Sequence, residues 1–303
     1  MLRRLALSLG IVAFSLVIIA LVVTAPKSVS AGSLPPHTPN LENGRIMFEA
    51  GGCSSCHMTP GQKNRSLLGG GLALKSPYGV FYPPNISPDP QFGIGSWSEA
   101  DFVTAMHEGT SPKGTNLFPS FPYTSYTHMQ IADVRDLFAY LKTLPPVTER
   151  SRAHELRFPY GLRPLVGIWK FMFFKDNVFQ PDPNQSAEWN RGAYLVNGPG
   201  HCAECHSPRN ALGAVIAERK FTGGPNPSGE GKVPSITQGN LDLWSVKDIE
   251  TLLEKGETPD DDTIGKSMAE VVENTAQLPP EDRHAMAVYI KSLAALPDEK
   301  KPD

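Results

Sequence analysis

The chain has 303 residues, of which 40% are apolar and 19% are charged, with 28 basic residues against 31 acidic ones. This length is enough for one large domain or two of ordinary size, each with a core of its own. The near balance of charge excludes a basic nucleic-acid binder, and the low charge content excludes an acidic disordered chain. The four cysteines are too few for a disulfide scaffold, so their positions point to another role.

Residues 5–23 form an uncharged apolar run that follows Arg3 and Arg4 and precedes Lys27. Its 19 residues exceed the ~7–15 of a cleaved signal core and approach the ~20 that span a bilayer. Basic residues before such a run favour export of everything that follows it. We therefore interpret residues 1–31 as a membrane anchor, with a signal peptide cleaved after Ala31 as the alternative, and we place the rest of the chain outside the cytoplasm.

The four cysteines fall in two copies of one motif, C-x-x-C-H. The copies are CSSCH, with Cys53, Cys56 and His57, and CAECH, with Cys202, Cys205 and His206. C-x-x-C-H is the attachment signature of c-type haem, in which both sulfurs bond to the vinyl groups and the histidine binds the iron. A zinc site would require further cysteines, and a redox dithiol would not explain the repeated histidine. The sequence therefore predicts two covalently bound haem c groups.

The repeat extends beyond the motif, because Trp97 and Ser98 recur as Trp244 and Ser245, 147 residues later. In both copies the serine has an aspartate three residues after it and a glycine eleven residues after it, which predicts a helix with an N-cap and a C-terminal glycine. A last amphipathic helix is also predicted in each half. We expect a mostly α-helical fold with tandem cytochrome c domains at residues 32–148 and 188–303, joined by a linker at 149–187.

The linker is rich in proline and carries the aromatic run WKFMFFK at residues 169–175. It has two interpretations, a second contact with a membrane or partner, or a strap across both domains whose aromatic side chains pack inward. We favour the strap, because the run is too short to span a membrane.

An electron-transfer haem needs a second axial ligand, which is commonly methionine. The offset of 147 residues places Met268 opposite Phe121. Met268 is predicted to lie in an irregular stretch between two helices and to bind the second iron. Phe121 cannot bind iron, so the sixth ligand of the first haem is Met129, His128 or none.

Two further kinds of residue are candidates for contacts with haem propionates. Arg209 follows the second motif and is predicted either to pair with a propionate or to remain in solvent. Trp97 and Trp244 occupy the same place in the two halves and are predicted either to donate to a propionate or to pack in the core.

Three stretches resemble the cytochrome c subunits of membrane-bound bacterial dehydrogenases for alcohol, gluconate, sorbitol and aldehyde. They are WNRGAYLV at residues 189–196, CHSPRN at 205–210 and NISPD at 85–89, and the likeness covers nearly all of residues 43–296. The resemblance implies electron transfer from a flavin, quinoprotein or molybdenum partner to quinone or a terminal oxidase. Most such subunits carry three haems, whereas this chain has two motifs.

No nucleotide-binding loop, nucleophile elbow or spare ligand cluster is present in the sequence, so we predict an electron-transfer protein rather than an enzyme. The leading hypothesis is a di-haem relay between a dehydrogenase partner and the respiratory chain, on the periplasmic side of the bacterial inner membrane. The alternative, motivated by Phe121, is a first haem with an open sixth position that binds small ligands or acts like a peroxidase.

Overall fold

The structure, a computed structural model, describes residues 22–229, 231–265 and 267–297, together with residues 4, 8, 10, 11, 14, 15 and 18. Most of the apolar run at residues 5–23, and with it the predicted anchor or signal, lies outside the described residues. Within the described part of the chain, no helix combines the length and the apolar composition that crossing a bilayer requires.

The fold is mostly α-helical, as predicted, with two very small sheets. The helices are α2 (Leu41–Ala50), α3 (Cys53–His57), α4 (Glu99–Glu108), α5 (Tyr123–Tyr126), α6 (Ile131–Leu141), α7 (Arg163–Phe173), α8 (Ala187–Asn197), α9 (Ala203–His206), α10 (Val246–Lys255), α11 (Ser267–Thr275) and α12 (Pro280–Lys291), with 3-10 turns at Ala31–Ser33 and Ala217–Arg219. The strands are β1 (Leu74–Ser76), β2 (Gly79–Phe81), β3 (Glu155–Leu156), β4 (Gly224–Pro225) and β5 (Lys232–Val233). The sheets are antiparallel, in the orders β1-β2-β3 and β4-β5.

In the first half, α2 crosses α6 so closely that the two backbones touch. A Cβ on Gly44 would overlap the Asp136 carbonyl oxygen and lie 2.7 Å from the Cβ of Tyr140. The second half repeats the crossing between α8 and α12, where a Cβ on Gly192 would overlap the Ala285 carbonyl oxygen. Only glycine leaves room for such an approach, which explains why both helices carry one at this position.

The sequence also predicts the ends of α4 and α10 correctly. Ser98 and Ser245 each accept a hydrogen bond from the backbone N–H of the aspartate three residues on, and that aspartate accepts one back, which forms a capping box. Both helices end at a glycine in the left-handed region, with φ of 55° at Gly109 and 74° at Gly256.

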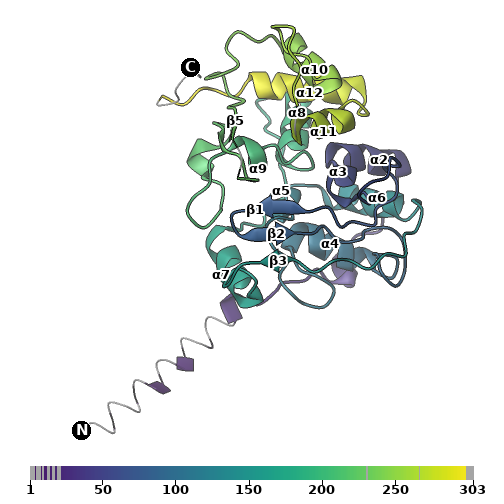
Figure 1. Cartoon of the computed structure of the whole chain (residues 1–303), viewed down its shortest axis with the longest axis vertical. Helices are drawn as coiled ribbons and strands as arrows, with labels where there is room; N and C mark the ends of the chain where they lie inside the picture. Colours follow the sequence, from purple (N-terminus) through teal and green to yellow (C-terminus); the bar gives the residue numbers. More distant parts are fainter. Residues whose placement is uncertain are drawn as a thin grey trace.

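The two groups of helices lie next to each other, and α11 of the second group contacts α2 of the first. Figure 1 shows α8, α10, α11 and α12 together at the top, and α2, α4 and α6 with the three-stranded sheet below them. The short helices α5 and α9 lie between the two groups. Buried residues of both groups belong to one continuous apolar cluster, which includes Met47 and Leu137 from the first and Leu195 and Met286 from the second.

Residues 149–187 are more structured than a linker, because β3 pairs with β2 and α7 follows. The segment contacts both halves of the protein. The Arg163 side chain donates to the Asn116 carbonyl at 2.7 Å, and the Trp169 indole donates to the Leu212 carbonyl at 2.9 Å. The prediction that the aromatic run packs inward is wrong for part of it, since Phe171 is 65% exposed and its neighbour Met172 is 48% exposed. The helical period of 3.6 residues determines which side chains share a face of the helix. It does not determine which of these faces packs against the rest of the protein.

Candidate haem-attachment sites

The first motif begins at a tight turn and forms one short helix. Gly52 adopts φ of 55°, and α3 follows at once as Cys53–His57. Cys53 and Cys56 are free thiols. They are three positions apart, which is nearly one turn of helix, and His57 is the last residue of α3. In the second half, Cys202, at the N-cap of α9, and Cys205 are also free thiols.

The histidine of each motif is held by a backbone carbonyl. His57 Nδ1 lies 2.8 Å from the Pro84 carbonyl oxygen, and His206 Nδ1 lies 2.8 Å from that of Pro234. A carbonyl only accepts, so Nδ1 carries the proton in both rings and Nε2 presents its lone pair. This arrangement fixes the tautomer and orientation of a metal-binding histidine. Burial lowers the pKa of both His57 and His206, which keeps the rings neutral and able to bind iron.

The two thiols of each motif differ in their exposure. Burial raises the pKa of Cys53 and Cys202 to about 12 and that of Cys56 to about 11. Cys53 and Cys202 pack against the apolar core, whereas Cys56 and Cys205 are exposed at the surface of their sites. Two free sulfurs, an imidazole with a free Nε2 and an apolar wall are the groups that covalent haem attachment requires, so both motifs fit haem c.

Met268 is not in the irregular stretch that we expected, because it lies in the first turn of α11 and is half-buried. Its alignment with Phe121 agrees with the backbone pairing just before it. The Leu117 N–H donates to the Gly109 carbonyl at 2.8 Å, and the Ile264 N–H donates to the Gly256 carbonyl at 2.9 Å. Both pairs of residues are 147 positions apart, and Phe121 and Met268 follow them by four residues.

The two candidates for the sixth ligand of the first haem, His128 and Met129, each have another structural role. His128 Nδ1 lies 2.6 Å from the Asn177 carbonyl oxygen, so this ring nitrogen is the donor of a hydrogen bond. Met129 is fully buried two residues before α6, and Leu278 is buried at the same distance before α12. That equivalence favours a packing role for Met129.

The two motifs contact each other. His201, which precedes Cys202, places Nε2 3.3 Å from the carbonyl oxygen of Gly51, which lies two residues before Cys53. The His201 ring also contacts the buried ring of Tyr126 edge-on, with centroids 5.7 Å apart. The Cys205 thiol is close enough to contribute to the raised pKa of Cys56. The sequence points to His201 only through its neighbour Cys202, and it carries no signal for Tyr126.

Hydrogen bonds between the halves follow a reciprocal pattern. Glu204, in the second motif, accepts from the Thr124 hydroxyl of α5 at 2.7 Å. Ser55, at the corresponding position of the first motif, accepts from the Asn274 side chain of α11 at 2.7 Å. Arg65 joins this contact, because it pairs with Glu49 at 3.0 Å and also donates to the Asn274 side-chain oxygen. Each haem motif therefore accepts a hydrogen bond from a helix of the opposite half: the first motif from α11 and the second from α5.

Other predicted candidates have their own partners in the structure. Arg209 is partly exposed, forms an ion pair with Glu204 at 2.6 Å and donates to the Gly213 carbonyl at 2.7 Å. Trp97 and Trp244 are both partly buried and pack against the apolar core.

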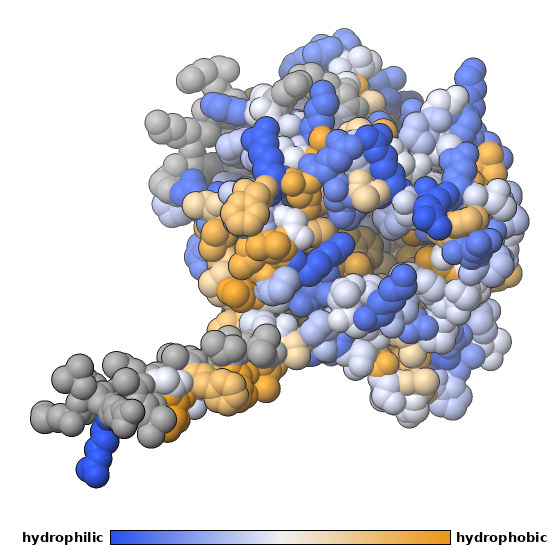
Figure 2. Space-filling view, turned by 60° about the horizontal axis from the view of Figure 1, so that its bottom comes forward, coloured by the Kyte–Doolittle hydropathy of each residue, from blue (hydrophilic) through white to orange (hydrophobic). Residues whose placement is uncertain are grey.

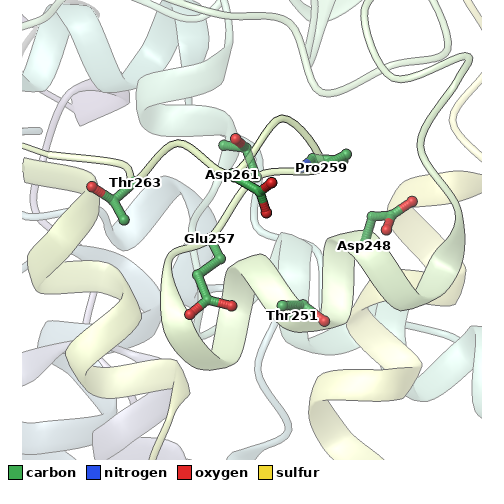
Figure 3. A pocket seen from close by; sticks show the side chains of 7 residues that line it. Asp248, Thr251, Glu257, Pro259, Asp261 and Thr263 are labelled. Atoms are coloured by element: carbon green, nitrogen blue, oxygen red, sulfur yellow. The ribbon is translucent and has the colours of Figure 1, made fainter.

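An acidic hollow lies beside α10, away from both motifs. It is lined by Asp248, Glu257 and Asp261 among others. Figure 3 shows that these carboxylates point in different directions instead of toward a common point. Among the residues that the structure describes, no group of His, Cys, Asp and Glu side chains is arranged to hold a metal ion.

Comparison with known proteins agrees with the motifs. The family model described as "Cytochrome c" matches residues 41–145. The chain is 47% identical over 261 residues to a "Diheme cytochrome c-type" protein of Cereibacter sphaeroides, and the match covers 86% of this chain and 88% of that protein. The chain belongs to the cytochrome c family. The predictions of a c-type cytochrome and of an electron-transfer role are thereby confirmed.

Two further relatives are subunits of larger enzymes. The cytochrome c is 41% identical over 258 residues to one subunit of the nicotinate dehydrogenase of Pseudomonas putida, a match of 85% of this chain and 22% of that protein. It is 34% identical over 290 residues to the cytochrome c subunit of the quinone alcohol dehydrogenase of Gluconacetobacter polyoxogenes, a match of 89% of this chain and 60% of that protein. The chain therefore spans less than two thirds of the length of either relative.

Proposed function

We propose that this cytochrome c is an exported di-haem protein that relays single electrons between a dehydrogenase partner and the respiratory chain. Residues 32–148 and 188–303 form its two haem domains. Cys53 and Cys56 would hold one haem, with His57 as an iron ligand. In the second domain Cys202, Cys205 and His206 would have the same roles, and Met268 would supply a further ligand to the iron.

The haem groups supply a one-electron Fe(III)/Fe(II) couple. The surrounding residues hold each axial imidazole in place, through the carbonyls of Pro84 and Pro234, and exclude water with an apolar wall. Fixed ligands and a dry site reduce the rearrangement that accompanies a change of charge.

The main support for an electron relay is the contact between the two motifs. His201 and Gly51 meet at 3.3 Å, and Tyr126 packs against His201 within the same interface. Two haems attached to these motifs would lie on either side of this contact, and the contact would let an electron pass between them inside one chain. Two domains that faced away from each other would need an external carrier.

The relatives support a dehydrogenase as the electron donor, because subunits of nicotinate and alcohol dehydrogenases align with most of this chain. We place the acceptor on the quinone or terminal-oxidase side. Residues 5–23 act as the export signal, and as the membrane anchor if they are retained. This assigns the protein to the periplasmic side of the inner membrane.

The test is a redox titration of the full-length, haem-loaded protein. We expect two one-electron transitions and two haems per chain by mass. Cys202→Ser combined with Cys205→Ser should leave one transition and one haem. Three outcomes would each refute the proposal: a single haem in the unaltered chain, no reduction by any dehydrogenase subunit encoded beside it, or oxidation of an organic substrate by the chain alone.

A second function rests on Phe121, which stands where the second half has Met268. With no sulfur at that position, the first iron would lack a methionine ligand there and would be able to bind a small ligand. Carbon monoxide should then change the spectrum of the reduced protein, and Phe121→Met should abolish that change. If carbon monoxide leaves the spectrum of the unaltered protein as it was, this second function is excluded.

A further inference from the structure

Helix α7 buries Val166 and Gly167, directs its two cationic side chains toward the protein and leaves other apolar side chains exposed. Lys170 turns inward, where its ammonium donates to the Glu108 carbonyl and, at 2.9 Å, to the Asn116 side-chain oxygen. Arg163 also turns inward, with its guanidinium 3.9 Å from the centre of the Phe118 ring. Val166 and Gly167 complete the buried side.

The exposed side of α7 is entirely apolar. Its members are Leu165, Ile168, Phe171 and Met172, and the loop before the helix adds Phe158, which is 87% exposed, Tyr160 and Leu162. We call these seven residues the α7 face. Figure 2 shows an orange patch on the side of the molecule from which the N-terminal segment extends, and Figure 1 places α7 on that side. Contiguous apolar surface of this kind marks an interaction site.

The apolar run at residues 5–23 joins the body of the protein at this helix. The Thr24 carbonyl oxygen accepts from the Asn116 side chain at 3.5 Å. The same oxygen packs so closely on Gly167 that a Cβ there would lie 2.6 Å from it. Nineteen uncharged residues therefore lead to the back of the helix whose front is the α7 face.

We propose that the α7 face rests on the surface of a lipid bilayer and holds the first half of the protein flat against it. At 11 residues, α7 is too short to cross a membrane of ~30 Å. It is suited to lie in the interface, as amphipathic helices do, with aromatic side chains at headgroup depth. The run at residues 5–23 ends beside the same helix, which is the reason to choose lipid over a protein partner. The contact uses none of the haem-binding residues.

The absence of spare thiols permits a direct test. All four cysteines are committed to haem, so Phe171→Cys gives the haem-loaded, full-length chain one reactive thiol on the α7 face. Leu243→Cys is the matched control, because Leu243 is an apolar residue that is 92% exposed and precedes α10 at the other end of the molecule. Both proteins are reconstituted into vesicles of zwitterionic and anionic phospholipid and labelled with a water-soluble maleimide.

We expect the thiol at position 171 to react at least ten-fold more slowly than the thiol at position 243, and the ratio to persist when lipid is added in excess. Equal rates at the two positions would overturn the proposal. Protection that fades as the chains are diluted in lipid would assign the face to a second copy. Protection that requires an added dehydrogenase subunit would assign it to that subunit. Either result also overturns a lipid contact. The redox titration proceeds independently, so this proposal can fail while the relay stands.

Discussion

The close crossing of α8 and α12 makes Gly192→Ala a sharp test of the second half. The added Cβ would overlap the Ala285 carbonyl oxygen and lie 2.9 Å from the Cβ of Tyr289. Neither atom can move by a rotamer change, so the helices themselves must separate. Overpacking of this kind costs ~1–3 kcal/mol, and backbone overlap places it at the upper end. Alanine returns ~1 kcal/mol through its higher helix propensity. We therefore expect a net loss of ~2 kcal/mol.

The measurement is chemical unfolding of the haem-loaded protein, followed by helical circular dichroism. Gly44→Ala tests the equivalent crossing in the first half and should cost a similar amount. Gly265→Ala is the control, because a Cβ there meets nothing within 4 Å. If Gly192→Ala unfolds within ~0.5 kcal/mol of the unaltered protein, as ordinary surface substitutions do, the two backbones do not touch and our account of the crossing is wrong.

Three other predictions use the same unfolding assay. Burial lowers the pKa of Lys170 from 10.5 to about 8, so the unfolded chain binds the proton more tightly between these values. Stability should therefore rise as the pH increases from about 8 to 10.5, and Lys170→Met should remove that rise. Asn274→Ala removes the bond to Ser55 and a partner of Arg65, and should cost ~1–2 kcal/mol. Ser245→Ala removes the cap of α10 and should cost ~1 kcal/mol. An unchanged midpoint would contradict the corresponding assignment.

Local signals in the sequence were sufficient where the structure depends on neighbouring residues. The caps at Ser98 and Ser245 and the terminal glycines at Gly109 and Gly256 lie where the pattern predicts them, because the hydrogen bonds involved span only a few residues. The C-x-x-C-H motif is equally local, since its spacing is set by one turn of helix.

Features that depend on tertiary contacts were not predictable in the same way. The outward direction of Phe171 depends on Lys170 finding acceptors at the end of α4 and just beyond it, which are distant in the sequence. The strand β3 has only two residues and exists because β2 is beside it. Met268 falls inside α11 because that helix packs against the first half through Asn274, a contact that spans more than 200 residues.

The reciprocal contact between α5 and the second motif, and between α11 and the first, has the form of a two-fold dimer interface contained in one chain. Glu204 and Ser55 are equivalent by the 149-residue offset between the histidines of the motifs. The Ser125 hydroxyl of α5 also donates to Glu204, at 3.3 Å, and Ser125 and Asn274 are separated by the same offset. In such an isologous arrangement each half completes the surroundings of the other half's cysteines.

Attachment of the two haems should then be cooperative. Once one pair of sulfurs has been joined to its porphyrin, the partner site is held in shape for the second, and singly loaded chains should be rarer than independent attachment would leave them.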